Sequence, residues 1–269
     1  MKKAVSRVYM TLIFVFLYAP ILLLVVFSFN DTDTKSRTVW SGFSLRWYEM
    51  LFQDRMLLEA LRNTLIIAVC AAVGATILGT VAALGIHSMK SWRKKLVMNI
   101  TNLQMLNPEI VTGVSLMLLM VFVANLFGVT LGIVSIILAH ITFCLPYVIL
   151  SVLPKLGQMD PHLFEAAQDL GCTPVRSFFK VVLPEIMSGV ITGMVMAFTL
   201  SLDDFIISYF CSGTTQTLPV FIYSMTKKRV SPEINALSTL LFAVILILLL
   251  IINIRQGRMG KKAKKEADV

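Results

Sequence analysis

The chain has 269 residues, of which 57% are hydrophobic and only 14% are charged. Ordinary water-soluble domains are about 45–50% apolar and about 25% charged. The composition of this chain, with a mean hydropathy of +0.81, therefore excludes such a domain. A net charge of +9 could indicate nucleic-acid binding, but the Lys and Arg residues stand between long apolar runs, which favours a role in membrane topology.

The N-terminus has the layout of a signal peptide, with Lys2, Lys3 and Arg7 before an apolar run. That run is too long for the apolar core of a signal peptide, and no A-x-A-like cleavage site follows it. We therefore expect a retained first span in an all-α, polytopic protein with one transmembrane domain over 1–269. A helix needs about 20 apolar residues to cross a bilayer. Six stretches are long and apolar enough to be such spans: 8–28, 62–86, 103–125, 130–151, 187–209 and 235–254.

The connection over 30–60 is amphipathic and rich in aromatic residues: Trp40, Trp47, Tyr48 and Phe52. Such a segment is typical of a helix that lies at the membrane surface. We interpret it as an anchor at the membrane edge.

Basic residues set the expected orientation. Two thirds of the 24 Lys and Arg residues lie at the N-terminus, in the second and fourth connections and in the tail over 255–269. The positive-inside rule places these segments, and so both termini, in the cytoplasm, with the tail near anionic lipid head groups. The outer cluster Lys227-Lys228-Arg229 runs against the rule.

Small residues and cysteines complete the description of the spans. Two groups of small residues favour close helix packing: Gly74, Ala75, Gly79, Ala82, Ala83 and Gly85, then Gly189 and Gly193. The four cysteines form no CxxC or Cys/His cluster, so no structural disulfide or metal site is expected.

Three acidic residues stand inside predicted spans: Glu109, Asp203 and Asp204. A charge there costs about 2.5–3.5 kcal/mol, so each suggests a function. Glu109 follows Pro108, which interrupts the helix ladder, and broken helices often border transport pathways. Acidic groups without an in-span Lys or Arg favour a cationic cargo.

Asp203 and Asp204 are expected on one helix, about 100° apart. At most one of them then faces a pathway squarely. The other is expected to be buried against a neighbouring helix, bound to Ser201 or Thr199, or pushed to neutrality by burial. Adjacent carboxylates on one helix cannot face each other, which argues against an intramembrane aspartyl protease. His140 is interpreted as a hydrogen-bonded packing residue.

The inner connection over 152–186 is predicted to contain two short helices broken at Gly171. Glycine suits the left-handed residue that closes a helix, and Thr173-Pro174 suits the N-cap and first position of the next. Ala166 and Ala167 would let one side of the first helix approach a partner closely, while Glu165 pairs with a cation there.

Glu165-Ala166-Ala167, followed by Gly171 and then by Leu183-Pro184, resembles the EAA loop of ABC importer permeases of the MetI-like type. The resemblance implies a MetI-like permease fold whose cytoplasmic coupling helix docks on an ATPase subunit. It assigns this coupling to seven residues: Glu165, Ala166, Ala167, Asp169, Gly171, Leu183 and Pro184.

Four further stretches resemble the C-type permeases of spermidine/putrescine importers: His140–Tyr147, Phe198–Asp204, Tyr223–Thr226 and Ser231–Ala236. The resemblance implies a polyamine cargo and a bacterial cytoplasmic membrane. It also implies a heterodimer with a second, homologous permease, two copies of a cytoplasmic ATPase, and an extracytoplasmic polyamine-binding protein. We expect the substrate pathway to be lined by four residues: Glu109, Asp203, Asp204 and Tyr223.

Catalysis is not expected in this chain. It has no G-x-x-x-x-G-K-[ST] loop, so ATP and Mg would be bound by the partner ATPase, and no cofactor or nucleic acid is expected. Two alternatives stay open: an importer permease for iron, thiamine or an amino acid, and, less favoured, a secondary transporter, which would usually need more spans or an inverted repeat.

Overall fold

The computed structural model confirms the all-α class over the residues that it describes. Those residues are 2–31, 40–128, 130–160, 162–228, 233–244, 246–247 and 250. Within them, five helices are long and apolar enough to cross a membrane. The sixth predicted span is described only in part, as the apolar helix Glu233–Val244, and the tail over 255–269 lies outside the described residues.

The chain groups into two compact units, one formed by residues 1–58 with 222–269 and the other by residues 59–221. The first unit contains α1 (Lys2–Phe27), an apolar helix that matches the first predicted span, and α2 (Arg46–Gln53). The single domain inferred from the sequence stays a prediction.

The outer connection folds back on itself rather than serving only as an anchor. Phe29 stacks on Phe43 and contacts Tyr48, and the Trp47 Nε1–H donates to the Asn30 carbonyl at 2.9 Å. Two of the predicted aromatic anchors therefore hold this connection together. The other two are exposed and available to a membrane surface: Trp40 and Phe52.

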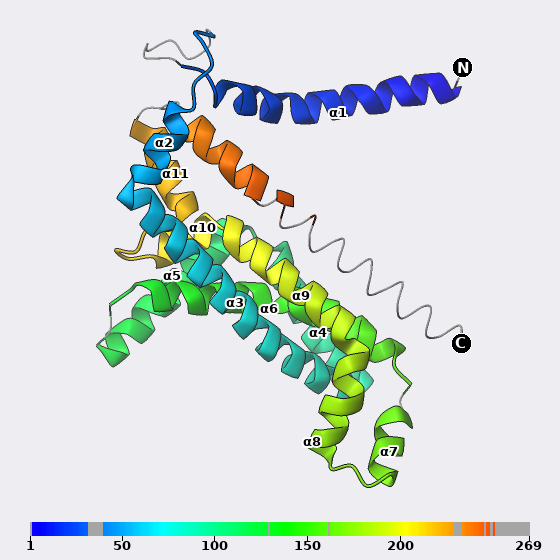
Figure 1. Ribbon diagram of the computed structural model, residues 1–269. Coiled ribbons are helices and arrows are strands. Elements are labelled where there is room, and N and C mark those ends of the chain that lie inside the picture. Colours follow the sequence, from blue (N-terminus) through cyan, green and yellow to red (C-terminus); the bar gives the residue numbers. More distant parts are fainter. Residues whose placement is uncertain are drawn as a thin grey trace. The chain divides into compact units, whose positions relative to one another are not determined.

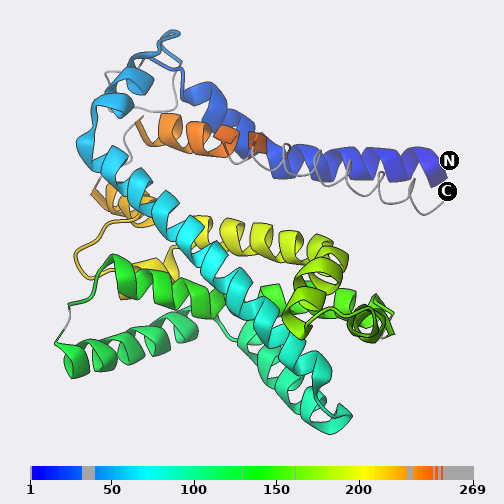
Figure 2. The same cartoon turned by 60° about the horizontal axis from the view of Figure 1, so that its bottom comes forward.

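The second unit is built on three long helices that share one core: α3 (Arg55–Ser88), α6 (Ile133–Gln158) and α9 (Leu183–Asp203). Figures 1 and 2 show α6 and α9 running together, and these two helices form the most extensive packed pair described. Their hydrophobic core includes Ala75, Val148, Val152, Ile186 and Ala197.

Glycines let these helices approach closely, as the small residues predicted. A Cβ on Gly189 would lie 2.7 Å from the Ser151 carbonyl oxygen, and one on Gly193 would lie 3.1 Å from the Val148 Cα. Gly79 likewise faces Val148, since a Cβ on Gly79 would lie 2.7 Å from the Val148 side chain. The prediction is wrong at Gly85, whose Cβ would meet nothing within 4 Å.

Replacing Gly189 by alanine is expected to destabilise the protein by about 1–3 kcal/mol, because the added methyl group overpacks the contact with α6. Thermal unfolding of the detergent-solubilised protein should show a lower Tm. Gly157→Ala is the matched control, since Gly157 is helical and its Cβ would meet nothing within 4 Å. Equal Tm values for the two variants would contradict the close approach.

Two predicted span boundaries are wrong because the helices break inside them. The third span does not run through 103–125: α4 (Ser91–Leu106) ends first, and α5 (Glu109–Phe127) forms the span. Asn107 is extended, with ψ 138°, as expected for the residue before proline. The fifth span, predicted over 187–209, ends at Asp203 and is followed by the short helix α10 (Ile206–Cys211).

Candidate functional site

The two helix breaks lie close together. The α4–α5 break falls at Asn107–Pro108 and the α9–α10 break at Asp204–Phe205. Helices α5 and α10 pack against each other, and a Cβ on Gly113 of α5 would lie 3.1 Å from the side chain of Ile206. The glycine therefore brings the first turns of both helices to one place.

A cavity of about 370 Å³ opens at this place. It is lined by Glu109, Phe143, Thr199, Leu200, Asp203, Asp204, Phe205 and Ile206. All three predicted in-span acids thus line one cavity, although they come from different helices. No Lys or Arg is among the lining residues, so the cavity suits a cation, and its two phenylalanines suit an apolar chain or a cation over a ring.

Asp203 and Asp204 occupy different environments. Asp203 is the last residue of α9 and is exposed, whereas Asp204 is extended (φ −66°, ψ 120°) and its side chain is only 5% exposed. The expectation that both stand on one helix is therefore wrong, because the helix ends between them. Of these two aspartates, only Asp203 offers an exposed carboxylate to the cavity.

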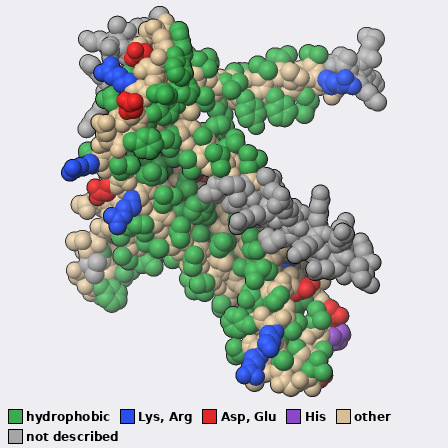
Figure 3. Space-filling model, viewed as in Figure 1, with side chains coloured by type: hydrophobic (Ala, Val, Ile, Leu, Met, Phe, Trp, Pro, Cys, Tyr) green, Lys and Arg blue, Asp and Glu red, His purple; other side chains and the backbone are tan. Residues whose placement is uncertain are grey.

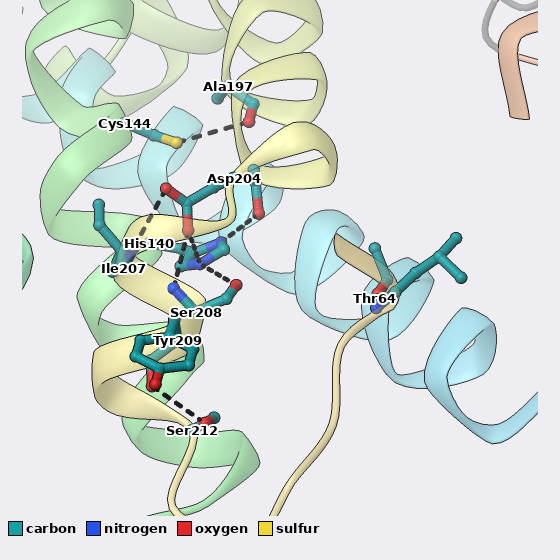
Figure 4. Close-up of polar contacts among 11 residues, drawn as sticks. Thr64, His140, Cys144, Ala197, Asp204, Ile207, Ser208, Tyr209 and Ser212 are labelled. Carbon is teal, nitrogen blue, oxygen red and sulfur yellow. Dashed lines mark hydrogen bonds and ion pairs between the residues drawn. The ribbon is translucent and has the colours of Figure 1, made fainter. Parts of the chain in front are cut away.

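Asp204 is held by a buried polar network, shown in Figure 4. Its carboxylate accepts the backbone N–H groups of Ile207 at 3.3 Å and Ser208 at 2.8 Å. His140 Nε2 lies 3.3 Å from Asp204 Oδ2, and His140 Nδ1 lies 2.7 Å from Ser201 Oγ. The carboxylate therefore caps the first turn of α10, and Ser201 reaches it only through the imidazole.

The direct bond from Asp204 to Ser201 or Thr199 is not found among the described residues, since Thr199 donates to the Val195 carbonyl instead. His140 is a hydrogen-bonded packing residue, as predicted, but its partner was missed. A signal existed: ionisable residues within spans usually pair with one another, and His140 stands in an apolar stretch with no Lys or Arg nearby.

Tyr223 lies on α11 (Leu218–Lys228), where Lys227 Nζ sits 4.8 Å from its ring centroid. This residue belongs to the first unit, so its place on a pathway stays a prediction. Within the second unit, the start of α11 is tied to α3 because the Leu218 N–H donates to Thr64 Oγ1 at 2.7 Å.

The predicted coupling loop contains α7 (His162–Asp169), which lies with α8 (Pro174–Ser177) at one end of the second unit (Figure 1). Gly171 has φ +87°, and its N–H donates to the Gln168 carbonyl at 2.8 Å. The Cys172 N–H donates to the Ala167 carbonyl at 3.1 Å. This pair of bonds is the Schellman motif, so the predicted helix end at Gly171 is confirmed, as is Thr173-Pro174 as the next N-cap and first position.

The second short helix is not separate, contrary to the prediction. A π-helical turn, η1 (Phe178–Val182), joins α8 to α9, and the Leu183 N–H donates to the Phe178 carbonyl. Pro184 has no N–H and its ring would clash with the carbonyl four residues earlier, so the widened turn accommodates it. The result is one continuous helical rod, Pro174–Asp203.

The residues of the predicted coupling helix point in different directions. Glu165 is exposed and pairs with His162 at 3.6 Å, and Ala166 and Asp169 are also exposed. Ala167 is only 8% exposed, so the two alanines do not form one open side as expected. Figure 3 shows charged side chains gathered at this end of the unit.

The chain matches the family "Binding-protein-dependent transport system inner membrane component" over residues 75–265. It is 44% identical to the "Putrescine transport system permease protein PotI" of Escherichia coli (strain K12), with 86% of this chain and 83% of that protein covered. It is 38% identical to the "Spermidine/putrescine transport system permease protein PotC" of the same strain, with 90% of each covered.

Solved structures share the fold at low identity. A chain of a bacterial ABC transporter involved in the import of the acidic polysaccharide alginate matches with TM-score 0.72 and 18% identity over 95% of each chain. The MetNI methionine ABC transporter matches with TM-score 0.60 and 19% identity over 78% of this chain and 96% of that one. The chain is therefore a multi-pass permease, a transport subunit that belongs to the family of binding-protein-dependent transport system inner membrane components.

Proposed function

We propose that this permease forms half of the translocation pathway of an ATP-driven polyamine importer. The observation that carries the proposal is the cavity in which Glu109 and Asp203 are exposed and no Lys or Arg is present. A polyamine is a chain of methylene groups between protonated amines, so it needs carboxylates for its charges and apolar walls for its carbons. The lining phenylalanines, Phe143 and Phe205, meet the second requirement.

The names of the similar permeases support this cargo over iron, thiamine or an amino acid. A second, homologous permease would supply the other half of the pathway, and an extracytoplasmic polyamine-binding protein would deliver the cargo. Two cytoplasmic ATPase subunits would bind ATP and Mg. The distribution of basic residues supports a topology with both termini and the α7–α8 loop on the side of those ATPases.

The continuous helical rod would transmit a movement of the ATPase subunits to the cavity. It spans 30 residues, Pro174–Asp203, or roughly 45 Å at 1.5 Å per residue. Its first residues follow the Gly171 turn, and its last residue, Asp203, lines the cavity. A displacement of α7 at one end would therefore move an exposed carboxylate at the other.

Expression of the chain with its permease, ATPase and binding-protein partners in a polyamine-uptake-deficient bacterium tests the proposal. We expect ATP-dependent accumulation of labelled putrescine or spermidine, and loss of that accumulation in Glu165→Ala. The Glu165–His162 pair is exposed, and such pairs contribute about 0–1 kcal/mol, so the variant should insert normally. Uptake of thiamine or an amino acid instead would reject the polyamine cargo.

A further inference from the structure

We infer that His140 is a positioning residue. Its contact keeps the Asp204 carboxylate at the helix break, so that Asp203 and Glu109 are the carboxylates that face the cargo. This inference rests on the proposed function and assigns separate tasks within the same cavity. It begins from the burial of the pair, since the His140 and Asp204 side chains are only 1% and 5% exposed.

Two hydrogen bonds and a close contact with His140 surround the Asp204 carboxylate. A carboxylate offers about four lone-pair sites, and three donors from this chain lie within reach: the N–H groups of Ile207 and Ser208 and His140 Nε2. None of these three donor residues is among those that line the cavity. Few lone-pair sites of Asp204 are then left for an ammonium group of the cargo.

The imidazole suits this task with Nε2 protonated. Nε2–H then points between Asp204 Oδ2 at 3.3 Å and Ser208 Oγ at 3.2 Å, while Nδ1 accepts from the Ser201 hydroxyl at 2.7 Å. His140 thus joins α6, the end of α9 and the first turns of α10. Removing its Nε2 donor would release Asp204 and loosen the break that ends α9 at Asp203.

Asp203 lacks these restraints. No hydrogen bond joins its side chain to any residue in the described ranges, and it is exposed at the cavity. Two adjacent aspartates therefore differ in role because the helix ends between them. The break separates a carboxylate that holds the backbone from one that is free to pair with a cation.

Neutralising the two aspartates one at a time provides the first test. The assay measures labelled putrescine moved per ATP hydrolysed by the complete importer in vesicles. We expect Asp203→Asn to lose at least about ten times more transport per ATP than Asp204→Asn, a difference of about 1.4 kcal/mol. An asparagine at 204 keeps one oxygen, which can still accept the shorter of the two bonds, from the Ser208 N–H. Losses of equal size, or a larger loss in Asp204→Asn, would overturn the inference.

Two amide substitutions of His140 provide the second test. The glutamine side-chain nitrogen reaches roughly the position of Nε2, whereas the shorter asparagine reaches only that of Nδ1. We expect His140→Asn to lower putrescine per ATP about tenfold and His140→Gln to retain most of it. The exposed His87 serves as the control, and His87→Asn should match the wild type.

A double variant separates positioning from packing. If His140→Asn acts by freeing the Asp204 charge, adding Asp204→Asn should recover part of the lost transport, which a packing defect would not allow. Equal behaviour of the two His140 variants, or no recovery, would overturn the inference. Should His140→Asn fail to assemble, the comparison of Asp203→Asn with Asp204→Asn decides. A wild-type importer that moves a different cation would reject the polyamine cargo, and the same variants would then be measured with that cation.

Discussion

Replacing Gly171 by valine is expected to lower polyamine uptake at least about thirtyfold while ATP hydrolysis by the complex continues. Valine at φ +87° costs roughly 1–2 kcal/mol, and the two bonds of the Schellman motif contribute about 0.5–1.5 kcal/mol each. The chain would leave the turn, so α7 would no longer be held against the start of the helical rod. Uptake and ATP hydrolysis measured in the same vesicles should therefore separate.

Gly128→Val is the matched control for this variant. Gly128 closes α5 with φ +65°, and like Gly171 it would place a Cβ where nothing lies within 4 Å. Valine carries the same backbone penalty at both sites, but only Gly171 lies in the coupling loop. We expect Gly128→Val to retain transport per ATP. A similar separation of uptake from hydrolysis in both variants would reject the coupling assignment.

The sequence predicted the features that neighbouring residues determine. Gly171 with Thr173-Pro174 is enough to end one helix and begin the next, and the structure shows both. Pro108 likewise breaks its own helix, although the prediction kept that break inside a span rather than at its start. These signals are local because glycine and proline act on their own φ angle and on the residue before them.

The break after Asp203 could not be predicted in the same way. No glycine or proline stands near it, and Asp204 is held there by His140, which is 64 residues earlier in the chain. The end of α9 therefore combines a local cap, made by the N–H groups of Ile207 and Ser208, with a tertiary contact from His140 of α6. For the same reason Asp204 lies outside α9, although the sequence predicted that Asp203 and Asp204 share one helix.

The predicted coupling helix, α7, shows a second limit of sequence reasoning. Helical spacing identifies the residues that share a face of a helix. It does not say which of them pack within the chain and which stay exposed to a partner. Ala167 is buried, whereas Ala166 and Glu165 are exposed. Ala167 therefore fits a role in fixing α7, and its neighbours fit contact with an ATPase. The π-helical turn before Pro184 was also missed, because it arises only when the loop and the span form one rod.

The double variant Glu109→Gln with Asp203→Asn is expected to lower putrescine transported per ATP at least about a hundredfold. It removes both exposed carboxylates of the cavity while leaving the capped Asp204 in place. Hydrogen bonds to charged groups contribute about 1.5–3 kcal/mol each, so losing two of them costs about 3–6 kcal/mol, and each 1.4 kcal/mol is tenfold. ATP hydrolysis should persist, because neither residue lies near α7.

Glu59→Gln is the control, since Glu59 is an exposed glutamate on α3 that does not line the cavity. It should transport as the wild type does. A double variant that transports within about threefold of this control would show that the two carboxylates are structural, and the cargo charge would then have to be met by the partner permease. A large loss in the double variant with smaller losses in each single variant would instead mean that one cargo molecule engages both acids, as expected for a cation charged at both ends.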